Sequence, residues 1–331
     1  MGANLQCNNA ERGTHVCGRT AVPLINKCGS GYVAPILRGR HHNATMKYVA
    51  PTIRRFEHDD LDFADRQKER EGWAASREQF KLYLEHDRNG CFVAMADDQP
   101  VGMVTTTSFG PSAWIGNLIV EPDFRSRGIG RALMEHAIDQ LRERGATTVR
   151  LEGDPPGIPL YRKLGFVDEF ESCRLNLPES KERPTMNDPT AEPMTTDDLD
   201  EVAALDTEIV GPNRRRFLEL KFFAAELALV HRRNARIVAS LLASPTNRGF
   251  RISPGVALEP EDARCLITAA ISAASGRPVL IGLPALNTDA LDMLAEMGFE
   301  KGASSLRMRL GPAIDAGDPT RVFAIASGAA G

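Results

Sequence analysis

One short stretch limits what this chain can fold into more than any other. An apolar, β-branched run at 114–120 is typical of a buried strand, and Glu-Pro-Asp at 121–123 ends it. A loop follows, Arg125-Ser-Arg-Gly128-Ile-Gly130, and apolar residues then recur on one face of a helix from Ile129 to Leu141. Free backbone N–H groups and the positive end of the helix dipole meet at such a helix start. The stretch therefore predicts an anion-binding site.

Two better-known phosphate loops do not fit this pattern. A dinucleotide-binding fingerprint needs a third glycine three positions after Gly130, where Leu133 stands, and no βαβ unit with a ribose-binding acid follows. A P-loop needs Gly-Lys-Ser/Thr after its glycines, which is absent here. A strand-to-helix turn without a ligand is the simplest alternative. Turn geometry alone, however, does not explain two arginines beside two glycines.

Composition narrows the classes of function. The chain has 331 residues, enough for two domains, and its net charge of −4 gives no general attraction to nucleic acid. No apolar run is long enough to cross a membrane. Six cysteines, at positions 7, 17, 28, 91, 173 and 265, form no CxxC pair and match no common zinc spacing, so no metal site is expected. Unpaired cysteines without a secretory signal indicate a cytoplasmic protein.

The chain divides into four segments by pattern. Residues 1–50 contain one acid and show no hydrophobic period, which predicts a disordered extension, with a transit peptide as the alternative and Met46 as the expected true start. Residues 51–178 read β, α, α, β, β, β, α, β, α, β, so we expect an α/β fold with a mixed sheet and helices packed on it. Residues 179–193 are polar and proline-rich, as in a linker.

The fourth segment, 194–331, repeats the first domain. FEHDDLD at 56–62 resembles MTTDDLD at 194–200, and LYRKLGFVDEFESCRL at 160–175 resembles MLAEMGFEKGASSLRM at 293–308. These echoes predict a duplicated domain. Glu261 and Asp262 stand where a phosphate site would need Gly and Arg, and acids there would repel a pyrophosphate. We therefore expect the second domain to keep the fold without the phosphate loop, and the tail RVFAIASGAAG to dock as a strand.

The loop resembles the hallmark of the GNAT superfamily of N-acetyltransferases, a strand followed by (Arg/Gln)-x-x-Gly-x-(Gly/Ala) and a helix. A second GNAT hallmark, an aromatic–Gly–Phe ending, is present as Leu160-Tyr161-Arg-Lys-Leu-Gly165-Phe166. The resemblance covers residues 51–178. The second half resembles the degenerate GNAT-like domain that follows an active one in some bacterial tandem members. The resemblance implies tandem GNAT-like folds, each a mostly antiparallel twisted sheet flanked by helices.

The resemblance also implies acetyl-CoA as co-substrate and assigns residues to it. The cofactor-binding residues are carried over from the loop, where they would hold the pyrophosphate, and from the helix start that continues it: Arg125, Ser126, Arg127, Gly128, Ile129, Gly130, Arg131 and Ala132. The strand edge would pair with the pantetheine amides and supply an N–H to the thioester carbonyl, through Leu118, Ile119 and Val120. In many members an Asn before the tyrosine touches the cofactor; this chain has Pro-Pro-Gly at 155–157.

The residues that transfer protons are harder to predict from the sequence. By resemblance, Tyr161 is the general acid that protonates the leaving thiolate, although a core tyrosine with a satisfied hydroxyl is the plain alternative. Glu121, Glu152 and Asp154 lie near the right strand ends to act as the base, but such acids are more often solvated or cap an element. The acid that some members place early in the central strand would fall near Trp114 here, so a water chain is the remaining option.

The function expected from these residues is acetyl-CoA-dependent N-acetylation of a small-molecule amine, by direct attack in a ternary complex. The second domain would wall the acceptor cleft, with one acetyl-CoA per chain. A non-catalytic acyl-CoA-binding sensor or scaffold is an alternative from another class. Acetylation of protein N-termini or lysines would use the same chemistry. Neither nucleic acid nor a membrane is expected as a partner, and the chain is expected to be a monomer or a homodimer.

Overall fold

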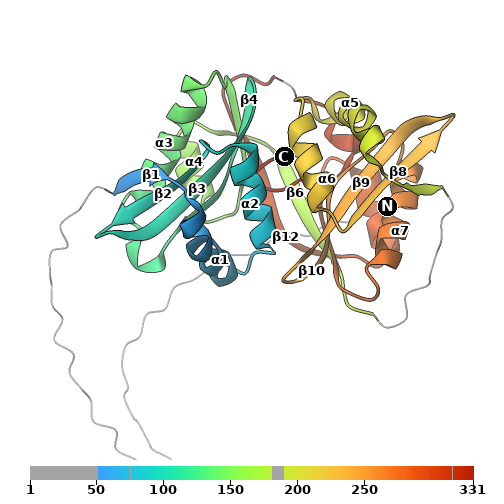
Figure 1. The fold of residues 1–331 in the computed structure, drawn as a ribbon, viewed down its shortest axis with the longest axis horizontal. Helices are drawn as coiled ribbons and strands as arrows, with labels where there is room; N and C mark the ends of the chain where they lie inside the picture. The colour runs from blue at the N-terminus through green and yellow to red at the C-terminus, as the bar shows by residue number, and fades with distance from the viewer. Residues whose placement is uncertain (1–50, 75, 181–189, 315) are drawn as a thin grey trace, which may run out of the picture. The chain divides into compact units, whose positions relative to one another are not determined.

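The computed structural model describes residues 51–74, 76–180, 190–314 and 316–331 (Figure 1). The predicted extension at 1–50 and most of the predicted linker at 179–193 lie outside the described residues, as do Cys7, Cys17 and Cys28. Among the described helices, none combines the length and the apolar character needed to cross a membrane.

The first half follows the element order predicted from its sequence, and the α/β fold class is confirmed. Its elements are β1 (Thr52–Arg55), α1 (Leu61–Arg70), α2 (Arg77–His86), β2 (Cys91–Ala96), β3 (Gln99–Phe109), β4 (Ser112–Val120), α3 (Ile129–Glu143), β5 (Thr148–Gly153), α4 (Ile158–Lys163) and β6 (Val167–Leu177). The apolar face expected for α3 is buried along its whole length, from Ile129 to Leu141.

The second half repeats this order element by element. It contains β7 (Ala191–Pro193), α5 (Leu199–Val210), α6 (Arg215–Ala224), β8 (Leu227–Arg233), β9 (Arg236–Thr246), β10 (Gly249–Ala257), α7 (Pro260–Ala273), β11 (Val279–Pro284), α8 (Thr288–Glu296), β12 (Glu300–Leu310) and β13 (Val322–Ala324). The three central pairs of corresponding strands have equal lengths: β3 and β9 have 11 residues, β4 and β10 have 9, and β5 and β11 have 6. The duplication seen in the sequence is therefore structural, and only β13 has no counterpart among the described strands of the first half.

All described strands join one 13-stranded sheet, and the two halves exchange strands at its centre. The order is β1-β2-β3-β4-β5-β12-β6-β11-β10-β9-β8-β7, with β13 paired to β10. The last long strand of the second half, β12, lies between β5 and β6 of the first half, and β6 in turn pairs with β11. The predicted segments 51–178 and 194–331 therefore share a sheet.

The parallel pair β4–β5 separates soon after it begins. Residues 112–114 pair with 148–150, and β4 then continues to Val120 without further pairing to β5. On its other side β4 stays with β3, where Asn117 and Leu118 lie opposite Val104 in a β-bulge and Asn117 has a φ of 51°. The second half of β4 thus turns one backbone edge toward a gap between the two strands.

In the second half the matching gap is filled by the chain itself. Strands β10 and β11 pair at Phe250 and Arg251 and then separate. Strand β13 enters there, pairing antiparallel with β10, and the next residue, Ile325, donates its N–H to Gly282 O at 2.7 Å. The tail therefore docks as a strand, as its apolar run predicted, and it fills the space between β10 and β11.

The ring of Phe323, 1% exposed, anchors β13, and a Cβ on Gly255 would lie 2.4 Å from it. We expect Phe323→Ala to lower the free energy of unfolding by about 3–5 kcal/mol, because the substitution leaves a cavity that packed neighbours cannot refill. Urea denaturation followed by circular dichroism measures this. The control is Phe223→Ala, since Phe223 is 67% exposed and its loss should cost little. Equal, small losses in both variants would contradict the docking of β13.

Candidate functional site

The loop before α3 presents a row of backbone donors. Ser126 has a φ of 62° and Gly128 a φ of 85°, so two residues in the left-handed region alternate along the loop. Such alternation turns successive N–H groups toward a common point. Within the described part of the chain, the N–H groups of residues 126–131 make no hydrogen bond, and the next one, of Ala132, donates to Gly128 O at 3.0 Å. The loop can therefore offer several N–H groups to an anion.

The arginine side chains of this region are bound to the protein instead. Arg125 Nε donates to Val120 O at 2.8 Å, and its guanidinium forms an ion pair with Glu71. Arg127 donates to the Asp123 carbonyl, and Arg131 pairs with Glu135 on the exposed face of α3. In this arrangement the anion site consists of backbone groups, and Arg125 serves to tie the loop to the end of β4. The roles assigned to these residues from the sequence stay predictions.

The loop, the end of β4 and α4 converge at Gly130. A Cβ on this glycine would lie 3.6 Å from Val120 Cγ2 and 3.8 Å from Leu160 Cδ2. Leu118 and Val120 pack against the core cluster that contains Tyr161, whereas Ile119 belongs to the cluster on the opposite face of the sheet. The three residues predicted to bind the pantetheine arm therefore share the backbone edge of β4, not a common side-chain face.

Tyr161 lies on α4 with its hydroxyl against the preceding loop. A Cβ on Gly157 would lie 2.8 Å from that hydroxyl, so the Pro-Pro-Gly sequence at 155–157 lets the phenol approach the backbone closely. Burial of the side chain, followed by the charge of Asp154, raises the pKa of Tyr161 to about 12. Among the described residues the hydroxyl has no hydrogen-bond partner. At neutral pH it is a protonated donor.

Two of the three carboxylates considered as bases are held by neighbouring cations. Glu121 accepts from Gln67 Nε2 at 2.5 Å and forms an ion pair with Arg70. Asp154 pairs with Arg174 at 2.6 Å. Both carboxylates are therefore already engaged by neighbouring side chains of the protein.

The third carboxylate, Glu152, is buried at the exchanged strands. Its side chain is 2% exposed and accepts from Arg307 Nε at 2.5 Å, from Ser305 Oγ at 3.0 Å and from Ser172 Oγ at 3.2 Å. Because Ser305 and Arg307 belong to β12, the second half supplies most of this shell. The sequence identified Glu152 but not its partners on β12, since Ser305 and Arg307 lie more than 150 positions away.

The C-terminal tail lies on the face of β4 opposite α3. Ser327 Oγ hydrogen-bonds to Tyr83 Oη at 2.7 Å, and Thr107 Oγ1 donates to Ala329 O at 2.9 Å. A Cβ on Gly116 would lie 2.2 Å from Ala329 Cβ. The tail thus covers the sheet next to the separation of β4 and β5. In the sequence, the run of small residues at 327–331 is the one signal of this role.

A buried lysine supports the tail from α6. Lys221 Nζ donates to Ser253 Oγ at 3.0 Å, and Ser253 Oγ donates to Ala326 O at 2.8 Å. Burial, followed by the charges of Arg251 and Arg214, lowers the pKa of Lys221 to about 7. Near neutral pH the folded protein therefore holds this amine partly neutral.

The lowered pKa of Lys221 makes stability depend on pH. Between about pH 7 and the ordinary lysine value of 10.5, the unfolded chain binds one more proton here than the folded one, so this group makes stability rise with pH across that window. We expect Lys221→Met to remove that rise, at most about 1.4 kcal/mol per pH unit. Urea denaturation of both proteins at pH 7 and 9.5 measures it. Lys81→Met, on the exposed face of α2, is the control, and parallel pH profiles for wild type and Lys221→Met would contradict the assignment.

Comparison with known proteins agrees with this geometry. The model of the acetyltransferase (GNAT) family matches residues 53–166, and that of a second acetyltransferase (GNAT) domain matches 202–324. An uncharacterised N-acetyltransferase of Bacillus subtilis, YitH, is 27% identical over 70% of this chain and 81% of its own. The holothin acyltransferase of a Pseudoalteromonas species is 25% identical over 78% of this chain and 86% of its own. The crystal structure of a candidate acetyltransferase from Pyrococcus horikoshii, 26% identical, superposes with a TM-score of 0.74 over 88% of this chain and 100% of that one.

The two family matches coincide with the two halves that repeat in the fold, and together they span more than half of the chain. The chain belongs to the GNAT acetyltransferase superfamily and carries two of its domains in tandem.

Proposed function

We propose that this protein transfers the acetyl group of acetyl-CoA to an amine of a small molecule, by direct attack in a ternary complex. The observation that carries the proposal is the open gap between β4 and β5, with unbonded loop N–H groups at one side and Tyr161 at the other. The described residues of the second half offer no such place. Its gap holds β13, and α7 begins with a capping box in which Glu259 and Asp262 satisfy each other's backbone N–H groups.

Backbone groups of the first half can bind acetyl-CoA, the acetyl donor. In the proposal, the N–H groups of residues 126–131 hold the pyrophosphate, as backbone donors at a helix N-terminus commonly do. The edge of β4 at Leu118, Ile119 and Val120 pairs with the pantetheine amides, in the manner of an added strand. The bulge at Asn117 changes the direction of the backbone at this point and so supports an N–H at Leu118 as the donor to the thioester carbonyl.

The chemistry requires one proton to leave the amine and one to reach the sulfur. Bound acetyl-CoA supplies an activated acyl group. Since Glu121, Glu152 and Asp154 are all committed to ion pairs, we assign removal of the amine proton to water. Tyr161, with a pKa of about 12, stays protonated beside a thiolate whose thiol has a pKa of about 8.5. Its role is therefore to stabilise the leaving thiolate as a hydrogen-bond donor, because full proton transfer from the phenol to sulfur would be uphill. The departing thiolate then takes its proton from water.

The position of the C-terminal tail favours a small molecule as the acceptor of the acetyl group. Residues 327–331 lie on the β4 face, where Gly116 and Glu152 meet Ala329 and Gly328. A folded protein surface would have to displace this segment to reach the separation of β4 and β5. A small amine needs only a gap beside it. Acetylation of protein N-termini or lysines stays the alternative within the same chemistry.

The loop assignment predicts a position-specific loss of affinity. In Gly128→Ala a side chain is forced to a φ of 85° at the start of α3, and we expect acetyl-CoA to bind about 10- to 100-fold more weakly as the N–H groups turn away. Isothermal titration calorimetry measures this. The matched control is Gly145→Ala, which imposes a φ of 92° just beyond the other end of the same helix and should leave affinity unchanged. Equal affinity in both variants would refute the loop as the cofactor site.

The assignment of Tyr161 predicts a loss of rate without a loss of binding. We expect Tyr161→Phe to lower kcat by about 100-fold while acetyl-CoA affinity stays within twofold, because only the leaving group loses a donor. Release of free CoA thiol with a panel of small amines and of peptides measures it. Turnover with peptides alone would favour the protein-acetylating alternative. Tight binding of acetyl-CoA with no thiol release from wild type under any condition would favour a non-catalytic sensor.

A further inference from the structure

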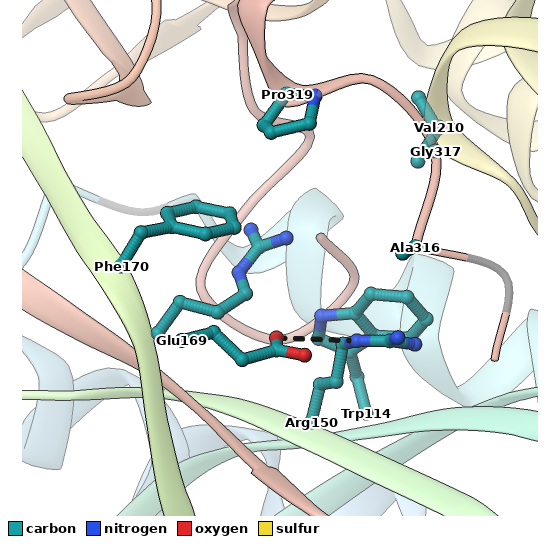
Figure 2. Close-up of a pocket in the computed structure, with 9 residues that line it drawn as sticks. Trp114, Arg150, Glu169, Phe170, Val210, Ala316, Gly317 and Pro319 are labelled. Atoms are coloured by element: carbon teal, nitrogen blue, oxygen red, sulfur yellow. Dashed lines mark hydrogen bonds and ion pairs between the residues drawn. The ribbon is translucent and has the colours of Figure 1, made fainter. Parts of the chain in front are cut away.

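A cavity of about 200 Å³ lies where the exchanged strands bring the two halves together (Figure 2). It opens beside the paired ends of β4 and β5, away from the edge assigned to acetyl-CoA. Its lining comes from both halves, with Trp114, Arg150 and Phe170 from the first and Val210, Arg307 and Pro319 from the second. The proposed acetyl transfer uses none of these side chains.

Three buried donors around this cavity have no partner among the described residues. They are the indole Nε1 of Trp114, the Nη1 of Arg150 and the Nη2 of Arg307. The three side chains are only 1%, 3% and 7% exposed. Buried N–H groups are nearly always paired, and a buried charged donor is the most costly to leave unpaired. Three such donors on side chains that line one cavity indicate a place built for an acceptor.

The charge of the lining favours an anion. Arg150 Nε lies 3.3 Å from Glu169 (Figure 2). Glu169 also accepts from Arg309 at 2.9 Å, and Arg307 is paired with Glu152. Three guanidinium groups therefore share two carboxylates among the described residues, and one positive charge is left over. Burial, together with the charge of Arg307, lowers the pKa of Arg150 against the opposing effect of Glu169, as expected for an under-compensated cation.

The remaining walls favour an organic ligand with one negative charge. Arg150 lies over the Trp114 ring at 5.5 Å and Arg307 over the Phe170 ring at 5.1 Å, so both cations are backed by aromatic surface. Val210 and Pro319 add aliphatic surface. Planar N–H forks match a carboxylate, and the apolar walls match a carbon skeleton. Inorganic phosphate would bring more than one charge to a site with a single uncompensated one.

We propose that this cavity binds a small organic carboxylate through Trp114 Nε1, Arg150 Nη1 and Arg307 Nη2. The proposal goes beyond acetyl transfer, and binding at this site requires neither acetyl-CoA nor an active Tyr161. It can therefore fail while the proposed enzyme activity holds, and the reverse is equally possible.

The test is binding of simple probes to the full chain without acetyl-CoA. We expect aliphatic and aromatic monocarboxylates to raise the Tm in a thermal-shift screen, and the best of them to bind with a measurable Kd in calorimetry. Their carboxamides, which keep the shape but lose the charge, should bind at least tenfold more weakly. Trp114→Phe should weaken binding about 3- to 10-fold, since it removes one donor and keeps an aromatic ring, and Arg150→Gln should weaken it further.

Two further variants keep the result interpretable. Ala316→Trp places a large side chain at the exposed edge of the cavity without altering any charge, so it should block binding even where Arg150→Gln proves unstable. Arg264→Gln removes an exposed arginine paired with Glu296 on the second half and should bind like wild type. Wild-type affinity in both Trp114→Phe and Ala316→Trp would overturn the proposal. A preference for inorganic phosphate would also overturn it. So would the absence of binding by any probe, which would mean that the three donors are paired with ordered water.

Discussion

The pairing of β12 with β5 and β6 is the interaction on which the rest of the structure depends. It joins two GNAT domains into one sheet, and it carries Ser305 and Arg307 to Glu152 in the first half. It also leads the chain after β12 back toward the centre, so that β13 and the tail can reach both gaps. A buried carboxylate, a tail on the β4 face and a cavity lined by two arginines all follow from that single exchange.

The two gaps differ in whether the chain pairs with the exposed strand edge. Both parallel pairs separate after two or three paired residues, so each half creates an unpaired strand edge. An open edge in a sheet is costly unless something pairs with it. In the second half the chain supplies its own strand, whose Phe323 packs onto Gly255. In the first half the edge stays open beside a loop of unpaired N–H groups, and a ligand is the natural partner.

The sequence predicted local features well because local physics determines them. The loop around Gly128, the apolar face of α3, the duplication and the docking of the tail were all readable from spacing and pattern. The partners of Glu152, the cavity around Arg150 and the contact of the tail with Gly116 were not. These depend on pairing between strands far apart in the chain, and periodicity indicates that a strand exists without naming its neighbour. A buried arginine in a strand also looks, in sequence, like a solvated one.

The exchange also makes the first half depend on the second. Without β12, β5 would lose the neighbour that covers its edge, and Glu152 would stay buried without Arg307. Removing the cation from a buried ion pair lowers stability strongly, because it leaves an uncompensated charge. Replacing both groups by apolar ones costs less stability. The first half therefore relies on β12 both for a covered edge of β5 and for the cation that balances Glu152.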